Sequence, residues 1–156
     1  MRIIDQQLLN RISSEARENP RQRKNFNLHP GDDFCCHRLL NAMEPASYIR
    51  PHRHLHPAKD ESMVMVRGRM GVLVFDEAGT VLNHVIISPA GAAVAVDIPH
   101  GLFHTVVSLE CGTVFFESKA GPYLALTEKE KGGWAPAEGT QEAASYLAHL
   151  KRLLKG

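Results

Sequence analysis

Histidine is the residue type with the clearest chemical potential in this sequence, because nine are present and three of them alternate along one short stretch. His52, His54 and His56 lie between Pro51 and Pro57. Side chains two residues apart on an extended strand point to the same face, so His52 and His54 can converge on one point. Neutral imidazole binds Mn, Fe, Co, Ni, Cu and Zn. The spacing therefore predicts one wall of a metal site.

A carboxylate and a distant imidazole complete this ligand set. Glu61 opens the next apolar run, and His104 follows the turn at Pro99-His-Gly, at the start of another predicted strand. We expect His52, His54, Glu61 and His104 to bind one divalent ion, because carboxylate adds charge and hardness to the imidazoles. His56 is kept as an alternative ligand or as a residue behind the ligands. The other histidines are interpreted as surface or core residues: His29, His37, His84, His100 and His149.

Such a site needs a scaffold that brings distant strands together, and the segment from about residue 33 to 126 has that pattern. Short β-branched or aromatic runs alternate with Gly- and Pro-containing turns about 8–12 residues apart, which indicates a sandwich or barrel. Several runs are apolar at both parities, so their strands need cover on both faces. We predict an all-β core with these strands: Met63–Val66, Val72–Phe75, Val81–Ile87, Ala92–Val96, Phe103–Val107 and Val114–Phe116.

A short amphipathic helix is expected near the N-terminus. Leu8 and Ile12 lie four residues apart behind Asp5, which can cap a helix, and Pro20 ends the pattern. A basic stretch over residues 17–24 follows, and we interpret it first as a solvated face. The minority hypothesis is that it folds across the mouth of the barrel and binds anions.

A second helix is expected at the other end of the sequence. Residues 140–155 place Leu147, Leu150 and Leu154 on one stripe, with basic side chains in the last turn. We interpret the chain as one compact domain in three parts: an N-terminal helix and covering arm (1–30), a β-barrel (31–126), and a linker with a C-terminal helix (127–156).

Composition excludes several classes of function. The 156 residues carry 18 Lys and Arg against 17 Asp and Glu, so the net charge of +1 gives no case for nucleic acid or an anionic membrane as partner. No apolar run approaches the roughly 18 residues of a membrane span, and the N-terminus lacks the layout of a secretory signal. Three cysteines make a poor disulfide framework, so a cytoplasmic location is expected.

The order His-x-His, Glu, Gly and then Gly, Pro-x-Gly-x-x-His resembles the two motifs of the cupin superfamily, over about residues 47–108. Three segments carry a closer resemblance, over most of the chain, to the WbuC family of cupin-fold metalloproteins: Arg21–His29, Arg38–Ala42 and Tyr48–His54. This resemblance implies an antiparallel jelly-roll barrel, a homodimer, and an origin among bacterial surface-polysaccharide genes. It implies no reaction.

The resemblance also implies that the metal ligands are His52, His54, Glu61 and His104. The general cupin spacing between the second histidine and the glutamate is shorter than the spacing from His54 to Glu61. That general spacing fits His54 and His56, whereas the WbuC-like pattern with its leading proline fits His52 and His54. We favour the second pair.

Three imidazoles and one carboxylate leave open positions on an octahedral ion, so two functions remain. The first is a metal-dependent enzyme acting on a small polar metabolite such as a sugar or sugar nucleotide. Tyr48 and Arg50 are then expected in the pocket, and Arg53 and Arg67 are nearby cations that can hold anionic groups. The alternative is a metal-stabilised ligand-binding or accessory module without turnover, because the sequence shows no activated nucleophile. Fe, Mn, Ni, Co and Zn all suit the ligands.

Overall fold

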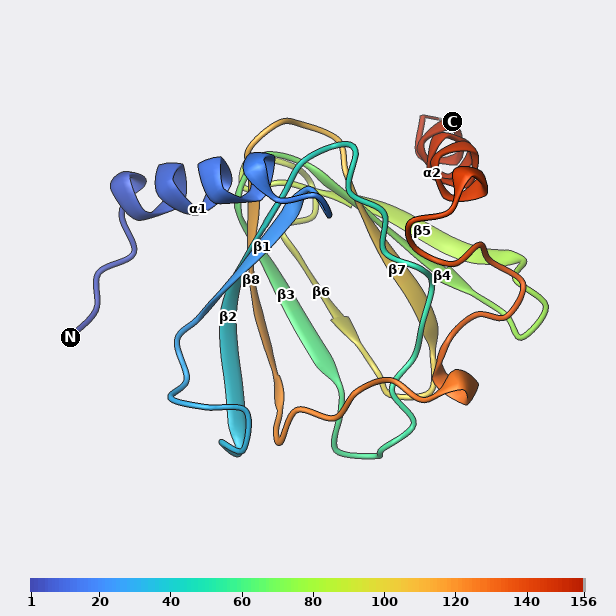
Figure 1. The fold of residues 1–156 in the computed structure, drawn as a ribbon, viewed down its shortest axis with the longest axis horizontal. Helices are drawn as coiled ribbons and strands as arrows, with labels where there is room; N and C mark the ends of the chain where they lie inside the picture. Colours follow the sequence, from blue (N-terminus) through green and yellow to red (C-terminus); the bar gives the residue numbers. More distant parts are fainter. Residues whose placement is uncertain (156) are drawn as a thin grey trace.

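The turn-punctuated middle of the sequence forms seven strands, an eighth strand precedes it, and a helix lies near each end of the chain (Figure 1). The computed structural model describes residues 1–155; Gly156, the last residue of the predicted C-terminal segment, lies outside them. The elements are α1 (Gln6–Glu18), β1 (Arg23–Asn27), β2 (Cys36–Met43), β3 (Glu61–Arg67), β4 (Met70–Phe75), β5 (Val81–Ile87), β6 (Ala95–Ile98), β7 (Phe103–Ser108), β8 (Thr113–Ala120), the 3₁₀ turn η1 (Glu128–Glu130) and α2 (Gln141–Leu153).

The strands form two antiparallel sheets. Five strands pair in the order β1-β2-β8-β3-β6, and three pair in the order β5-β4-β7. The all-β core with two flanking helices is therefore confirmed. The predicted barrel is not confirmed as a closed one, because within residues 1–155 the named strands of one sheet do not pair with those of the other. β6 pairs only with β3, and β5 only with β4, so both strands are sheet edges.

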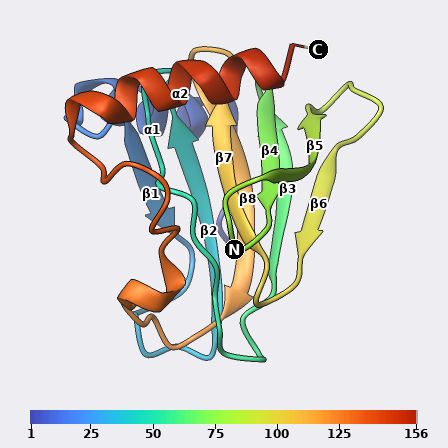
Figure 2. The ribbon, with the colours of Figure 1, turned by 90° about the vertical axis from the view of Figure 1, so that its right-hand side faces the viewer.

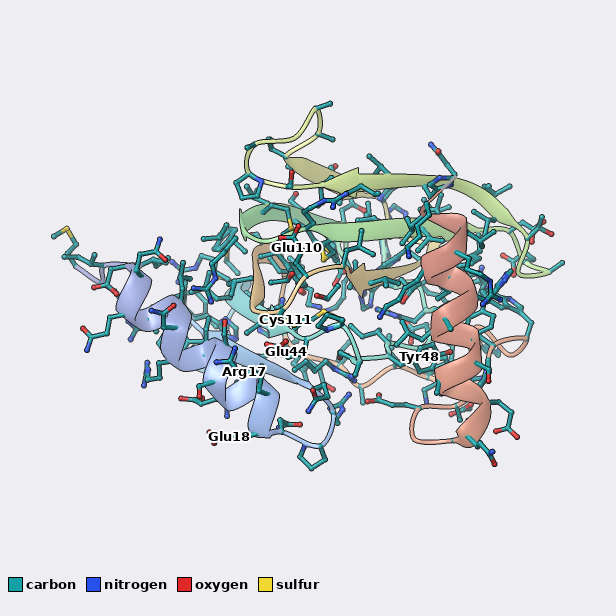
Figure 3. All side chains as sticks on the ribbon, turned by 90° about the horizontal axis from the view of Figure 1, so that it is seen from above. Arg17, Glu18, Glu44, Tyr48, Glu110 and Cys111 are labelled. Carbon is teal, nitrogen blue, oxygen red and sulfur yellow. The ribbon has the colours of Figure 1, made fainter. Side chains whose placement is uncertain are left out.

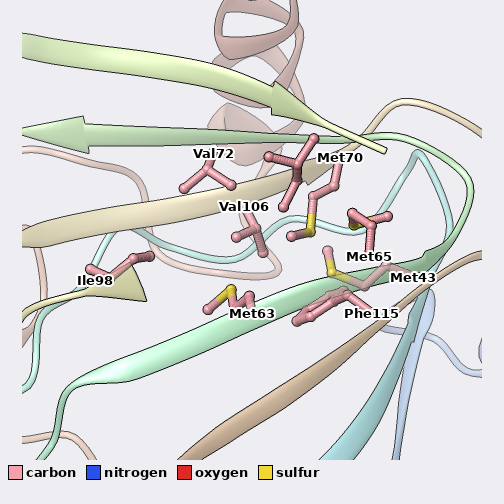
Figure 4. Packing of buried hydrophobic residues seen from close by; sticks show 9 residues of the cluster. Met43, Met63, Met65, Met70, Val72, Ile98, Val106 and Phe115 are labelled. Atoms are coloured by element: carbon pink, nitrogen blue, oxygen red, sulfur yellow. The ribbon is translucent and has the colours of Figure 1, made fainter. Parts of the chain in front are cut away.

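The core between the sheets is rich in methionine. On β3, Met63 and Met65 point inward, whereas the intervening Val64 is exposed. Figure 4 shows how side chains from both sheets meet in this layer. The full cluster is Met43, Met63, Met65, Met70, Val72, Ile87, Ile98, Val106 and Phe115. Each such side chain contributes about 1.5–3 kcal/mol when it is fully buried, so this layer holds the two sheets together.

The two helices cover the outer faces of the sheets, as the double-parity apolar runs require. Leu9 and Ile12 of α1 pack on Leu40 of the five-stranded sheet. Leu150 of α2 packs on Leu73 of the three-stranded sheet, across which α2 lies (Figure 2). No helix within residues 1–155 is both long and apolar enough to cross a bilayer.

The predicted N-terminal helix is confirmed together with its cap. The Asp5 carboxylate accepts a hydrogen bond from the Leu8 backbone N–H at 2.9 Å. Arg67 fastens this helix to the sheet, since its guanidinium donates to the Leu9 carbonyl and to the Gly112 carbonyl, both at 3.0 Å. Arg67 therefore has a structural role and does not line the cavity between the two sheets.

The basic stretch runs from the end of α1 into edge strand β1, which pairs with β2 from Arg23 opposite Met43 to Asn27 opposite Leu39. Arg17, Arg21 and Lys24 are exposed, which agrees with the solvated face that was expected. Alternate β1 side chains face the space between the sheets, where Arg23, Asn25 and Asn27 line a cavity. This strand was missed because Phe26 is its only apolar residue.

Candidate metal centre

The four predicted ligands lie at one point between the two sheets. One ligand atom from each of His52, His54, Glu61 and His104 falls within 4.8 Å of the others. Glu61 begins β3 of the five-stranded sheet, and His104 is the second residue of β7 in the three-stranded sheet. The group therefore spans the two sheets.

The segment that carries His52 and His54 is not the regular strand that was predicted. Only isolated bridges form there, from His52 to His104 and to Lys131: His52 N donates to His104 O at 3.0 Å, and His104 N donates to His52 O at 2.8 Å. Pro51 and Pro57 lack the N–H groups that would extend this pairing. The next contact is Gly101 N to His54 O at 2.7 Å, in a turn where Gly101 adopts φ +81° at low steric cost.

The distances around the Glu61 carboxylate fit neighbouring ligands of one metal ion. His54 Nε2 lies 3.0 Å from Glu61 Oε1, and His104 Nε2 lies 3.1 Å from Glu61 Oε2. Two ligand atoms that each lie about 2.1 Å from an ion, at a right angle, are about 3.0 Å apart. The same contacts serve as hydrogen bonds when the imidazoles are protonated, so protons and a metal compete for this site.

Backbone carbonyls orient two of the imidazoles. His52 Nδ1 lies 3.1 Å from Arg50 O, and His104 Nδ1 lies 3.0 Å from Leu102 O. A carbonyl oxygen only accepts hydrogen bonds, so Nδ1 carries the proton of each neutral ring. Each Nε2 then keeps its lone pair for a metal, as in known sites where the second ring nitrogen is held by an acceptor.

The electrostatics favour the charge states that bind metals. Burial, together with the neighbouring His104, lowers the pKa of His52 to about 3, so this imidazole is neutral at physiological pH. Burial alone would raise the pKa of Glu61, but hydrogen bonds from His104 and His54 and the charge of Lys119 hold it well below its usual range. Neutral imidazole and ionised carboxylate are the ligand forms, and the residues therefore fit a divalent cation.

Sequence reasoning missed a cation beside this group. Lys119 Nζ lies 2.6 Å from Glu61 Oε1 and 2.7 Å from Glu117 Oε1, and Asn41 Nδ2 donates to Glu117 Oε2 at 2.6 Å. Burial would lower the pKa of Lys119, but the charges of Glu117 and Glu61 raise it above its ordinary value. The available signal was the alternation of Glu117 and Lys119 beyond the predicted end of the last strand at Phe116.

A cavity of about 380 Å³ opens beside the ligand group. Part of its lining is apolar and comes from the core, including Met43, Met63 and Phe115. Its polar lining includes Asn25, His29, His37, Asn41, Glu117 and Lys119. His52, Glu61 and His104 line the same cavity, so a small polar molecule bound there would lie against the ligand group.

The two predicted pocket residues lie elsewhere. Tyr48 is buried beside α2 (Figure 3), and its hydroxyl donates to Pro136 O at 2.9 Å. Arg50 Nε donates to Gly132 O at 3.0 Å. Neither side chain lines the cavity, because both tie the segment before His52 to the linker that leads into α2.

The two remaining residues singled out near the histidine segment also lie away from the cavity. His56 is exposed and its Nδ1 accepts a hydrogen bond from Ala58 N at 3.2 Å, so it stands outside the ligand group. The Arg53 guanidinium pairs with Glu77 and lies 4.2 Å from the centre of the Phe103 ring. The spatial grouping contains the pair His52 and His54.

The family of the chain follows from its sequence match. A family model described as a domain of unknown function (DUF6016) matches residues 4–87, more than half of the chain. The chain belongs to this DUF6016 family. The matched part contains His52, His54 and Glu61, while His104 lies beyond it. No curated protein sequence matches the chain.

Solved structures identify the fold of this DUF6016 member. KdgF from Halomonas sp. aligns with a TM-score of 0.52 at 18% identity, over 68% of this chain and 84% of that one. The SPY1581 protein of unknown function from Streptococcus pyogenes aligns with a TM-score of 0.52 at 9% identity, over 79% of this chain and 90% of that one. The E162A mutant of Bacillus subtilis oxalate decarboxylase OxdC aligns with a TM-score of 0.46 at 21% identity, over 58% of this chain and 22% of the enzyme. KdgF is a cupin-fold protein, so the chain shares the cupin fold.

Proposed function

We propose that this protein is a mononuclear metalloprotein of the cupin type, in which His52, His54, Glu61 and His104 bind one divalent ion. The observation that carries the proposal is the convergence of these four side chains within 4.8 Å: Glu61 lies on β3, His104 on β7, and the two other histidines on the irregular segment that bridges to β7. In each neutral imidazole the ring nitrogen without a proton needs a partner for its lone pair, and a shared cation provides that partner for all three rings.

The ligand set accommodates Fe, Mn, Ni, Co or Zn. When bound, such an ion supplies Lewis acidity to an oxygen atom of a ligand in the cavity. The chain contributes the rest: Arg50 O and Leu102 O orient two imidazoles, and Lys119 keeps a positive charge beside Glu61. Asn41 and Glu117 extend this polar wall away from the ion.

We further propose that the cavity binds a small polar metabolite and that the protein is a metal-dependent enzyme acting on it. A sugar or sugar nucleotide of surface-polysaccharide synthesis is the metabolite that the WbuC resemblance favours. The same resemblance supports a jelly-roll topology and a homodimer, and the three cysteines, which make a poor disulfide framework, support a cytoplasmic location. The polar walls of the 380 Å³ cavity and the inward ligand group support a small polar partner.

The alternative is a metal-stabilised binding or accessory module without turnover. One observation favours it: among the described residues that line the cavity there is no serine, threonine or cysteine to act as a nucleophile. A metabolite screen separates the two functions, because an enzyme releases a product whereas a binding module gives saturable binding alone.

Elemental analysis of the purified protein tests the metal site. We expect about one divalent ion per chain after reconstitution with Fe, Mn, Co, Ni or Zn, and a loss of at least tenfold in metal affinity for Glu61→Gln. Glu77→Gln is the matched control, because this exposed carboxylate pairs with Arg53 away from the cavity. A wild-type chain that binds none of these ions would overturn the proposal.

A further inference from the structure

Two histidines that are not metal ligands form a stacked pair in the cavity wall. The rings of His29 and His37 are parallel to within 12°, with centroids 4.0 Å apart. Both residues are buried, and both line the same cavity as the ligand group. His37 on β2 is in register with Lys119 on β8, which is in register with Glu61 on β3. The pair therefore lies two strand spacings, about 10 Å, from Glu61.

The hydrogen bonds of His29 define which of its ring nitrogens carries the proton. The Arg38 backbone N–H donates to His29 Nδ1 at 3.1 Å. The Arg38 carbonyl is also 3.0 Å from this nitrogen, but a proton on Nδ1 would point toward the Arg38 N–H and deprive that partly buried backbone donor of its acceptor. Because Nδ1 accepts a hydrogen bond, the neutral ring carries its proton on Nε2, which becomes a donor.

The hydrogen bond of His37 also places the proton on Nε2, but it leaves an acceptor free where His29 has a free donor. His37 Nε2 lies 3.1 Å from the Asp32 carbonyl, which only accepts, so Nε2 carries the proton. His37 Nδ1 is then a free acceptor. Among residues 1–155 the fully buried side-chain nitrogens without a partner are Arg38 Nε, Arg53 Nε and Trp134 Nε1, so the two free imidazole nitrogens are reached by solvent.

We propose that His29 and His37 form a second subsite of this cavity, which binds a hydroxyl group of the ligand. A hydroxyl donates one hydrogen bond and accepts others, and it therefore matches one free donor beside one free acceptor. An anionic oxygen does not match, because the lone pair of His37 Nδ1 repels it. The side-chain amides of Asn25 and Asn41, in register on β1 and β2, add donors and acceptors along the same wall.

The opposite end of the cavity has different chemistry. Lys119 and the proposed ion place positive charge beside Glu61, which favours an anionic oxygen. The ligand class is therefore a small polyhydroxylated compound with an anionic group at the metal end and a hydroxyl at the histidine end. This inference rests on the proposed function for the metal end only, since the histidine end is formed by residues that are not in the ligand group.

The first arm of the test needs neither metal nor ligand. Nitrogen-15 NMR of histidine-labelled full-length protein at pH 7.5 reports which ring nitrogen is protonated. We expect the Nε2–H tautomer for both His29 and His37. An Nδ1–H tautomer at either residue removes the donor and acceptor pair and overturns the inference.

The second arm uses protein loaded with diamagnetic Zn²⁺ and three probes of matched length. D-gluconate has a carboxylate and hydroxyls, hexanoate has the carboxylate alone, and sorbitol has hydroxyls alone. We expect gluconate to shift the His29 and His37 nitrogen resonances and to bind at least tenfold more tightly than hexanoate or sorbitol. Equal affinity for gluconate and hexanoate contradicts the subsite.

Two variants test whether gluconate affinity depends on the histidine pair. His37→Phe keeps a ring for stacking but removes both nitrogens, and we expect a three- to tenfold loss of gluconate affinity, about the value of one neutral hydrogen bond. His84→Phe is the control, because this exposed histidine lies on β5. Unchanged affinity in His37→Phe overturns the inference while leaving the metal site intact. A chain that does not bind Zn²⁺ at all contradicts the proposed function instead, and the tautomers still test the subsite.

Discussion

His52 and His104 exchange both of their backbone hydrogen bonds, at 3.0 and 2.8 Å, although they lie on segments far apart in the sequence. This pairing of directly opposite residues is that of a hydrogen-bonded antiparallel pair. It places the two imidazoles side by side, with ring centroids 4.7 Å apart. The backbone therefore fixes the relative position of two of the four proposed ligands, independently of any bound ion.

Substitution of His52 tests whether the metal is bound by His52 and His54 or by His54 and His56. We expect His52→Ala to lower Zn²⁺ or Mn²⁺ affinity at least tenfold, because one of the four ligand atoms is lost. His56→Ala is the control, and it should keep wild-type affinity since His56 is exposed and outside the group. Calorimetric titration of both variants checks the prediction. The reverse order of effects would assign the site to His54 and His56.

Substitution of Lys119 tests how much this residue stabilises the metal-free protein, as distinct from the protein with metal bound. In Lys119→Met, Glu61 and Glu117 lose their shared cation, and buried carboxylates without a partner are costly. We expect the free energy of unfolding without metal to fall by about 2–3 kcal/mol, below the roughly 3–5 kcal/mol of a fully buried pair, because the Lys119 side chain is 21% exposed.

The metal should offset this loss, because a divalent ion neutralises Glu61 in place of the ammonium group. Thermal unfolding with and without saturating Zn²⁺ measures the difference. We expect the metal-induced increase in Tm to be larger in Lys119→Met than in wild type, and Lys119→Arg to retain most of the metal-free stability. An equal metal-induced increase in both proteins would show that Lys119 does not compete for Glu61.

Features that depend on a local sequence pattern could be predicted, whereas features that depend on how distant strands pair could not. α1 and the grouping of His52, His54, Glu61 and His104 were predictable, because a cap, an apolar period and the spacing of rare side chains are features of the sequence pattern. Lys119 was not, since its role depends on β8 continuing past the apolar run and pairing with β3 at Glu61. Tyr48 shares strand parity with His52, but the segment is irregular, so parity did not place it in the cavity.

The buried imidazole of His52 predicts acid sensitivity of the metal-free protein. Its pKa is about 3 in the folded state against 6.5 in the unfolded chain, so between these values only the unfolded chain binds the proton. The contribution of His52 to the free energy of unfolding is therefore fully present above pH 6.5 and is lost as the pH falls toward 3. Glu61 acts in the same direction below its ordinary value of 4.5, because its folded pKa is lowered.

Urea unfolding at several pH values between 7.5 and 4 measures this dependence. We expect a steep loss of stability in wild type and a shallower one in His52→Gln, which has no imidazole to protonate at that position. His84→Gln should follow the wild-type curve, because His84 is exposed on β5. Parallel curves for wild type and His52→Gln would assign the acid sensitivity to other groups.

Gly121 limits how the rim of the cavity can be packed. A Cβ at this position would lie 1.8 Å from the Phe34 carbonyl oxygen and 2.8 Å from His37 Nε2. The backbone of the Phe34 loop cannot move as cheaply as a side-chain end, so we expect Gly121→Ala to destabilise the protein by about 1–3 kcal/mol. The displaced His37 ring should also weaken gluconate binding.

Gly133→Ala is the matched control, because a Cβ there meets nothing within 4 Å. We expect it to be neutral or stabilising by up to about 1 kcal/mol, since alanine reduces the entropy of the unfolded chain. Metal affinity should be unchanged in both variants, because neither glycine contacts the four ligand side chains. Chemical denaturation and Zn²⁺ titration check these outcomes together: a loss of metal affinity in Gly121→Ala would mean that the histidine wall and the metal group move as one unit.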